Sequence, residues 1–294
     1  MNARTHSGAN IMAKYWVVIP AYNEAATIRD VALRATRQCK RVIVVDDGST
    51  DGTAEALVGL PITLLRNTMN CGKAASLWRG FQQALTAGAS GVMTLDGDGQ
   101  HAPEDIPRLL AEAAFYPDHV IIGARRRDQR RAAFRRYAAN RVADFWISWA
   151  AGYSFADSQS GFRVYPASLL RRVKIKHGKV RSFVFESEIL IEAMRSGHPS
   201  LAVPIEALRG PGARSSYFRP VLDIVRITCM VGWKLISRGM YPIGLYRSLF
   251  GPTSRPSGRY YAVEEVSPAR CAQPAPLNFG ARSLVEEHEE ALRQ

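Results

Sequence analysis

Two aspartates separated by one glycine, Asp96 and Asp98, follow a short apolar stretch, and Gln100 comes two residues later. Carboxylate and amide oxygens are the ligands that Mg²⁺ and similar divalent cations prefer in proteins. Gly97, between the two aspartates, would let a ligand approach the backbone closely. The same residues could instead form a polar turn before the next helix, because Asp and Gly are common in turns. The short DGD sequence alone does not separate a metal site from such a turn.

Acids also follow two other short apolar stretches. Glu24 comes shortly after residues 15–20, and Asp47 ends residues 41–47. The carboxyl ends of parallel strands meet at one edge of a sheet, so we expect these acids to share a site with Asp96. Glu24 and Asp47 could accept hydrogen bonds from a base or ribose, while the DGD acids hold a cation on phosphates. The sequence contains neither the GxGxxG dinucleotide-binding motif nor the GxxxxGK[ST] P-loop motif.

The elements that would position these acids alternate between two hydrophobic periods. Nearly continuous apolar, β-branched stretches predict buried strands at residues 15–20, 41–47, 61–67, 91–98 and 119–125. Helical patterns lie between them, at residues 24–39, 52–58, 73–87 and 103–115. Farther along, the sequence predicts helices at 130–152 and 186–196, a short strand after a turn within 157–166, and a strand at 200–208. This alternation predicts an α/β domain with a mostly parallel sheet flanked by helices.

Charge is distributed unevenly along the 294 residues. The net charge is +13, and residues 123–250 alone contain 23 Lys and Arg against 8 Asp and Glu. This excess predicts an anionic partner, such as lipid headgroups, phosphorylated substrates or nucleic acid. Nucleic acid is the weakest of these interpretations, because no known nucleic-acid-binding module is present.

The four cysteines show no CxxC or Cys/His spacing, which disfavours structural zinc and a disulfide framework. Residues 1–14 have no apolar segment typical of a secretion signal, and we expect them to be flexible. No apolar stretch reaches the roughly 18 residues that a membrane-spanning helix needs. We therefore expect a protein that is cytoplasmic, not secreted, and at most peripheral on the inner face of the cytoplasmic membrane.

Four segments together resemble a known family: "VVIPAYNEAATI", "VIVVDDGSTDGT", "NCGKAAS" and "LDGDGQHAPEDI". They are similar to the family 2 glycosyltransferases, and more narrowly to the branch with dolichyl-phosphate mannosyltransferase and bacterial polyprenyl-phosphate glycosyltransferases. The resemblance is specific over residues 15–106 and continues more loosely to about residue 220. It implies a Rossmann-like GT-A domain, which we place at residues 15–215.

The resemblance also implies roles for individual residues. A nucleoside-diphosphate sugar would be bound by Pro20, Tyr22, Asn23, Glu24, Val45, Asp47, Lys73, Asp96, Gly97, Arg125, Arg209 and Arg214. A Mg²⁺ or Mn²⁺ cofactor would be held by Asp96, Asp98 and Gln100. Lys73 could instead simply begin its helix. The chain departs from the dolichyl enzymes in "LRGPGARSSYFRP", where Ser216 stands in place of a lysine that follows a "GxS" sequence.

The acceptor decides whether a catalytic base is needed. A metal ion and arginines would stabilise the leaving diphosphate in one inverting displacement, which gives Asp98 a catalytic role. An ionised phosphate acceptor needs no base, whereas a hydroxyl acceptor needs a carboxylate, for which Glu186 and Glu188 are the candidates. These two acids could instead cap their helix or pair with Arg163. Arg163, in "DSQSGFRVYP", could itself hold an acceptor phosphate through two parallel hydrogen bonds.

Residues 216–250 combine aromatic and aliphatic residues with well-spaced cations, and they predict amphipathic helices. These helices either pack against the sheet or lie in a membrane interface near a lipid acceptor. Residues 251–294 are expected to be mostly disordered. The sequence as a whole predicts a glycosyltransferase with a polyprenyl-phosphate or related lipid acceptor. A glycosyltransferase acting on a hydroxyl of a glycan or glycolipid, and a non-catalytic nucleotide- or lipid-binding scaffold, are the alternatives.

Overall fold

The computed structural model describes residues 14–125, 134–179, 182–206, 220–251 and 253. The chain divides into two units, Met1–Ser257 and Gly258–Gln294, and the second lies entirely outside the described residues. The expectations of a flexible N-terminus and a disordered tail also fall outside them, apart from a few residues at their boundaries. The fold described below is that of the first unit.

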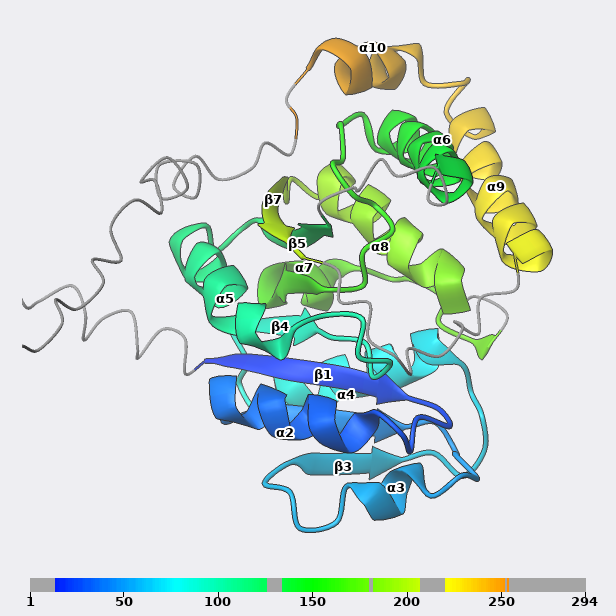
Figure 1. Cartoon of the computed structure of the whole chain (residues 1–294). Coiled ribbons are helices and arrows are strands. Elements are labelled where there is room, and N and C mark those ends of the chain that lie inside the picture. Colours follow the sequence, from blue (N-terminus) through cyan, green and yellow to red (C-terminus); the bar gives the residue numbers. More distant parts are fainter. Residues whose placement is uncertain (1–13, 126–133, 180–181, 207–219, 252, 254–294) are drawn as a thin grey trace, which may run out of the picture. The chain divides into compact units, whose positions relative to one another are not determined.

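A mixed sheet forms the centre of this unit, in the strand order β3-β2-β1-β4-β6-β5-β7 (Figure 1). Its described strands are β1 (Tyr15–Ala21), β2 (Val42–Asp46), β3 (Thr63–Arg66), β4 (Gly91–Thr94), β5 (Val120–Arg125), β6 (Arg163–Pro166) and β7 (Ser200–Ile205). All neighbouring strands pair in parallel except β6, which is antiparallel to both β4 and β5. The mostly parallel sheet that the sequence predicts is confirmed, and the antiparallel direction of β6 between β4 and β5 was not predicted.

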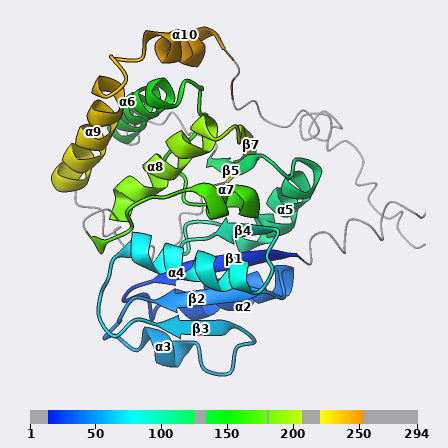
Figure 2. The same ribbon diagram turned by 180° about the vertical axis from the view of Figure 1, so that it is seen from behind.

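Helices cover both faces of the sheet: α2 is drawn in front, between β1 and β3, in Figure 1, and α4 is drawn in front of the sheet in Figure 2, which shows it from behind. The described helices are α2 (Ile28–Gln38), α3 (Thr53–Ala56), the short 3-10 helix η1 (Pro103–Asp105), α5 (Ile106–Phe115), α4 (Lys73–Thr86), α6 (Phe134–Ala151), α7 (Ala167–Arg172), α8 (Ser182–Arg195), α9 (Pro220–Ile236) and α10 (Pro242–Phe250). Prolines begin η1, α9 and α10, where the fixed proline φ suits a first helical turn. Within the described residues, no helix is both long and apolar enough to cross a membrane.

Helix α4 packs on the sheet through apolar residues that recur at helical spacing in the sequence. Ala74, Leu77, Phe81 and Ala84 recur at helical spacing and are all buried against β1, β2 and β4. Gly80 lies on the same face, and a Cβ there would come within 2.4 Å of Val18 Cγ1 on β1. Glycine at this position therefore lets α4 approach the sheet closely.

The predicted strands are found in their expected places, with small differences at their ends. The strand expected at residues 91–98 ends at Thr94, so Asp96 and Asp98 lie in the loop beyond it. The helix expected from residue 24 begins at Ile28, because residues 25–27 form a turn. Helix α7 was not predicted. Helices α9 and α10 account for most of the segment in which amphipathic helices were expected.

Candidate functional site

Three elements bring one charged side chain each to the carboxyl edge of the sheet. Lys73 begins α4, Asp96 follows β4, and Glu186 lies near the start of α8. The Lys73 Nζ atom lies 2.8 Å from Asp96 Oδ1 and 3.0 Å from Glu186 Oε2. All three side chains are partly buried. We call these three residues the central cluster, and they show that residues 73, 96 and 186 share one site.

Electrostatics favour the charged forms of Lys73 and Asp96. Burial by itself would lower the pKa of Lys73, but the negative charges of Asp96 and Glu186 outweigh it and raise that pKa. Burial would likewise raise the pKa of Asp96, and the positive charge of Lys73 reverses this and lowers it. Lys73 is therefore a cation and Asp96 an anion at neutral pH.

Asp98 lies beside the cluster in a different environment. Its Oδ1 accepts a hydrogen bond from the backbone N–H of Gln100 at 3.0 Å. Burial, and then the nearby charge of Asp96, raise the pKa of Asp98. The two aspartates thus disfavour each other's ionisation, and a divalent cation between them would remove that repulsion.

The residues of this loop fit a cation that is held jointly with a substrate. Among the described residues, no group of three or more His, Cys, Asp and Glu side chains is placed to hold a metal ion. Mg²⁺ is commonly bound by only one or two carboxylates together with substrate phosphates. Asp96, Asp98 and the amide oxygen of Gln100 provide oxygen donors of this kind. The predicted ligand set is therefore compatible with the structure and remains a prediction.

Gly97 does not have the open surroundings that the sequence suggests. A Cβ at this position would lie 3.3 Å from the Pro20 carbonyl oxygen and 3.2 Å from Ile28 Cδ1. The Thr27 hydroxyl donates a hydrogen bond to the Gly97 carbonyl at 2.7 Å. The missing side chain thus lets the DGD loop pack against the connection between β1 and α2. Contact of Gly97 with a diphosphate stays a prediction.

The antiparallel strand β6 delivers a second loop to Asp96. The Cα of Arg163 pairs with that of Thr94, the last residue of β4, and the Thr94 hydroxyl donates to the Gly161 carbonyl at 2.6 Å. A Cβ on Gly161 would lie 2.5 Å from Asp96 Oδ2. Only glycine leaves room for the carboxylate here. Gly161 was not predicted as a site residue, although it lies two positions before Arg163 in the segment "DSQSGFRVYP".

Arg163 is buried inside the fold. Its Nη1 donates to the Glu186 carbonyl at 2.6 Å and to the Tyr165 hydroxyl at 3.1 Å, and its Nη2 donates to the Ser158 carbonyl at 2.8 Å. The residue is 1% exposed. This arrangement ties β6 to α8 and does not present a free guanidinium to an acceptor phosphate. The structure thus gives Arg163 a positioning contact with the backbone of Glu186.

Arg125, at the end of β5, forms two parallel hydrogen bonds with Asp157. The Nε and Nη2 atoms lie 2.9 Å and 3.0 Å from the two carboxylate oxygens of Asp157. Burial would lower the pKa of Arg125, but the bond to Asp157 outweighs it and raises the pKa. Part of the side chain stays exposed. Its predicted contact with phosphates would have to form beside this ion pair.

The side chain of Asp47 is 3% exposed and is occupied by donors of the chain itself. Asn67 Nδ2 and the backbone N–H of Cys71 donate to its Oδ1 at 2.7 and 2.9 Å, and the N–H of Gly72 donates to Oδ2 at 2.7 Å. The carboxylate therefore shapes the loop that leads to Lys73. A contact with a base or ribose stays a prediction and would require some of these donors to move.

The loops after β1 and β2 hold each other in place. Asn23 has a φ of 54°, in the left-handed region that Asn tolerates better than most residues. Its backbone N–H donates to the Ser49 hydroxyl, and its side-chain oxygen accepts from the Thr50 N–H, both at 2.9 Å. The Glu24 N–H donates to the Thr53 hydroxyl at 2.8 Å. These bonds bring the two loops together, as the prediction of a shared edge requires.

The remaining residues predicted to contact the donor differ in their exposure to solvent, and two of them are not described. Pro20 and Val45 pair across β1 and β2, and the side chain of Val45 is fully buried in the core. Val45 could therefore meet a ligand only through its backbone. Tyr22 is partly buried in the connection after β1. Arg209 and Arg214 lie outside the described residues.

Glu188 is not brought to the central cluster. It lies two positions after Glu186 on α8, which turns it to another side of the helix. Its Oε1 lies 3.1 Å from Lys234 Nζ on α9, and the same lysine pairs with Glu192 at 2.6 Å. Of the two predicted candidates for a base, the structure places Glu186 at the site and Glu188 in the contact between α8 and α9.

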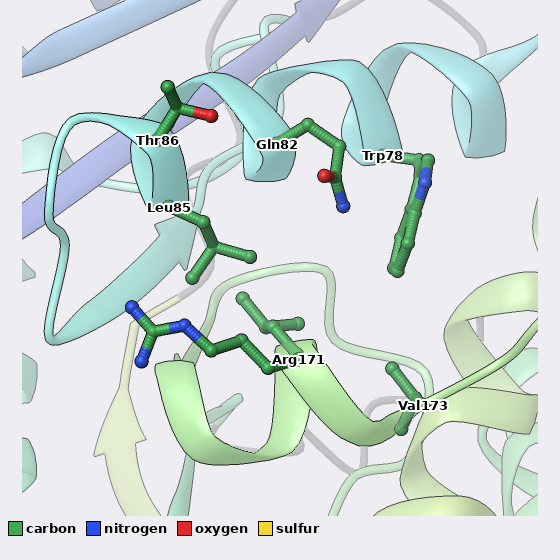
Figure 3. A pocket seen from close by; sticks show the side chains of 7 residues that line it. Trp78, Gln82, Leu85, Thr86, Arg171 and Val173 are labelled. Carbon is green, nitrogen blue, oxygen red and sulfur yellow. The ribbon is translucent and has the colours of Figure 1, made fainter.

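A hollow of about 340 Å³ lies between α4 and α7 (Figure 3). Its lining includes Trp78 and Gln82 from α4, Arg171 from α7, and Val173, which follows α7 directly. It contains none of the predicted site residues. Trp78 also stacks on His177, with ring centroids 5.2 Å apart. The hollow is therefore separate from the central cluster.

Comparison with known proteins identifies relatives of this chain. The sequence profile described as Glycosyl transferase family 2 matches residues 16–178. An uncharacterized protein of Methanocaldococcus jannaschii is 29% identical over 66% of the chain and 81% of its own length. Polyprenol monophosphomannose synthase of Mycolicibacterium smegmatis is 28% identical over 64% of the chain and 75% of its own length. An undecaprenyl-phosphate 4-deoxy-4-formamido-L-arabinose transferase of Proteus mirabilis is 34% identical over 52% of the chain and 48% of its own length.

Solved structures share the fold at lower identity. Glucosyl-3-phosphoglycerate synthase from Mycobacterium tuberculosis, in complex with Mn²⁺, uridine diphosphate and glucosyl-3-phosphoglycerate, is 22% identical and has a TM-score of 0.53. The match covers 78% of this chain and 82% of that one. The same enzyme with Mg²⁺ and uridine diphosphate has a TM-score of 0.55, over 79% and 82% of the two chains. These similarities show a common GT-A architecture.

Proposed function

Because the chain belongs to glycosyl transferase family 2, we propose that this glycosyltransferase moves a sugar from a nucleoside-diphosphate sugar to a polyprenyl phosphate or related lipid phosphate. The observation that carries the proposal is the meeting of Lys73, Asp96 and Glu186 at the carboxyl edge of the sheet. Two relatives named for polyprenol or undecaprenyl phosphate support this choice of acceptor. The acceptor would hold the reaction at the cytoplasmic face of a membrane.

A divalent cation fits the reaction at the DGD loop. Asp96, Asp98 and Gln100 would hold Mg²⁺ or Mn²⁺, which when bound would supply positive charge for the diphosphate. Structures of the similar glucosyl-3-phosphoglycerate synthase contain Mn²⁺ in one complex and Mg²⁺ in another, which supports this assignment. The cation would also offset the burial and the repulsion by Asp96 that raise the pKa of Asp98.

The chain's own cations support departure of the diphosphate. Lys73 lies at the start of the 14-residue helix α4, whose free N–H groups and dipole favour negative charge. Its ammonium group is already held at the site by two carboxylates, so little reorganisation is needed when phosphate charge develops there. Arg125, fixed by Asp157, interacts electrostatically with Asp96 and would add a second positive charge. Attack by an acceptor phosphate then needs no base from the protein.

One observation favours a second candidate, transfer to a hydroxyl group. Glu186 lies in the central cluster and is the only one of the two predicted bases that the structure brings there. A hydroxyl acceptor would need this carboxylate to take its proton. No comparable observation favours a non-catalytic scaffold, which would show no metal-dependent turnover and no effect of Asp98→Ala.

The donor is tested by thermal unfolding of the purified protein with UDP-, GDP- and dTDP-sugars, each with and without Mn²⁺. We expect the sugar nucleotides of one nucleobase to raise the Tm of the protein, and only when Mn²⁺ is present, because a ligand stabilises the state that it binds. No stabilisation by any donor would refute a nucleoside-diphosphate donor.

The acceptor is tested with a short-chain prenyl phosphate, the corresponding prenol and a glycan, using the donor found above. We expect transfer to the phosphate alone. Glu186→Gln and its neighbour Glu188→Gln separate the two candidates, since removal of a general base lowers the rate by roughly 100-fold or more. Two results together would show a hydroxyl acceptor in place of a phosphate: transfer to the prenol or glycan by the unmodified protein, and loss of that activity in Glu186→Gln but not in Glu188→Gln.

A further inference from the structure

Helices α6, α9 and α10 gather at one end of the described fold, at the top of Figures 1 and 2. Helix α10 contacts α6, and α9 contacts both α6 and α8. Side chains are described from residue 141 of α6 and from residue 225 of α9. These helices carry a large share of the exposed apolar side chains in the described part of the chain.

Helix α10 has an unusual division of residues between its two sides. The small residues Gly244 and Ser248 are buried, and Gly244 packs so tightly on Tyr241 that a Cβ would overlap its ring. The outward positions instead carry large apolar residues, namely Ile243, Tyr246, Leu249 and Phe250. A helix that faces water shows the opposite division. The outer side of α10 is therefore suited to an apolar environment.

Helices α9 and α6 extend the same property. Val225, Trp233 and Ile236 recur at helical spacing on α9 and are exposed, whereas Val231 and Leu235 on the other side are buried. On α6, the exposed side chains are Val142, Phe145 and Trp146. We call the exposed apolar residues of α6, α9 and α10 named in these two paragraphs the apolar face. An exposed group of this size on several elements marks an interaction surface.

The exposed charged side chains described on α6, α9, α10 and the 237–241 connection are all basic. Arg141, Arg238 and Arg247 are exposed, and each lies within two positions of a residue of the apolar face in the sequence. Among the described side chains of the three helices and the 237–241 connection, the one acid is Asp144, which is buried. Arginine side chains bordering an apolar helical surface are typical of contact with anionic lipid headgroups.

We propose that the apolar face docks this protein on an anionic lipid surface, with its aromatic and aliphatic side chains in the headgroup–acyl boundary and its arginines at lipid phosphates. A second copy of the chain is a poorer occupant. A two-fold interface would bring the arginines of both copies into one contact, and the described part of the face offers no exposed acid to compensate them. Ion pairs connect this surface to the helix that carries Glu186. Lys234 of α9 pairs with Glu188 and Glu192 of that helix, α8.

The test is sedimentation of the purified full chain with vesicles of phosphatidylcholine, with or without phosphatidylglycerol, in the absence of donor and acceptor. The variant is Trp233→Ser/Ile243→Ser/Phe250→Ser, whose three side chains are 71%, 60% and 74% exposed. The matched control is Val58→Ser/Met69→Ser/Phe115→Ser, which removes three comparably exposed apolar side chains elsewhere. Because the altered side chains are exposed, both variants are expected to fold, and circular dichroism checks this.

We expect the unmodified chain and the control to bind vesicles that contain phosphatidylglycerol. The apolar-face variant should bind at least about 100-fold more weakly, since each large side chain removed from the lipid costs roughly ten-fold. Arg238→Gln/Arg247→Gln should selectively lower binding to the anionic vesicles and reduce its sensitivity to salt.

Three results would overturn this proposal. They are an absence of vesicle binding by the unmodified chain, an equal loss in the control variant, and dissociation of a dimer by the apolar-face variant with unchanged vesicle binding. Light scattering after size-exclusion chromatography detects the dimer. Since no sugar donor or acceptor is present, failure here leaves the proposed transfer reaction untouched, and transfer to a water-soluble acceptor would still report on it.

Discussion

At the scale of single residues, Lys73 is the positive centre of the site. Two carboxylates from different elements lie within 3.0 Å of its ammonium group, and burial strengthens their attraction. Asp98 has no such compensation from a described ion pair, and burial raises its pKa. Removal of the Lys73 charge should therefore change cation binding, and removal of the Asp98 charge should change the stability of the fold.

Lys73→Met should leave Asp96 and Glu186 without their shared cation. We expect Mn²⁺ to bind the donor-free variant about ten-fold more tightly, because two uncompensated carboxylates attract it, while sugar transfer falls at least as much. Calorimetric titration with Mn²⁺ measures the first effect. Lys234→Met is the matched control, because that lysine also pairs with two acids but outside the site. Equal Mn²⁺ affinities in the two variants would contradict this role for Lys73.

Asp98→Asn should stabilise the metal-free protein while it abolishes transfer. The pKa of Asp98 is raised in the folded state, so the folded chain binds this proton more tightly than the unfolded chain. Its contribution to stability is therefore present at low pH and is lost as pH rises through the folded pKa. At pH 7.5 in a chelator we expect a higher Tm for the variant, and the difference should shrink towards pH 4. A lower Tm at pH 7.5 would show that Asp98 stabilises the fold.

At the scale of elements, β6 decides how the two halves of the site meet. It runs antiparallel between β4 and β5, so its first residue, Arg163, lies beside the last residue of β4. The loop before it then reaches Asp96 through Gly161, and the guanidinium reaches the first turns of α8. A parallel strand would send this loop to the opposite edge of the sheet.

Arg163→Met should lower the free energy of unfolding by about 3 kcal/mol or more, because buried acceptors of Glu186, Tyr165 and Ser158 lose their donor. Urea unfolding measures this change. Arg29→Met is the matched control, since Arg29 also donates to two backbone carbonyls but is exposed. Water can replace its bonds, so we expect a cost below about 1 kcal/mol. Similar costs in both variants would exclude a buried linking role.

At the scale of the whole molecule, the described site and sheet lie within one unit, Met1–Ser257. Helix α10 belongs to this unit, since it contacts α6 and the Trp149 indole N–H donates to the Tyr241 carbonyl at its start. Helix α10 is therefore part of the packing of this unit. None of the contacts described above involves a residue after 257.

A chain that ends at Ser257 should keep its Tm within about 2 °C and retain transfer to a water-soluble acceptor, because it preserves the contacts of the first unit. A chain that ends at Gly239 loses α10 and uncovers α6, so its Tm should fall clearly below that of the longer chain. Scanning calorimetry of the three chains measures both. Unfolding of the chain that ends at Ser257 would show that later residues support the fold.

The sequence by itself determined the alternation of strands and helices, the loops that carry Asp47 and Asp96, and the family. These features depend on the local period of apolar residues and on short motifs, which neighbouring positions encode. The tertiary structure alone decided that Glu186 reaches the site while Glu188 faces α9, and that Arg163 points inward. It also decided that β6 lies between β4 and β5 and that α10 turns its large residues outward. Each of these outcomes depends on contacts between elements far apart in the chain, which no local pattern specifies.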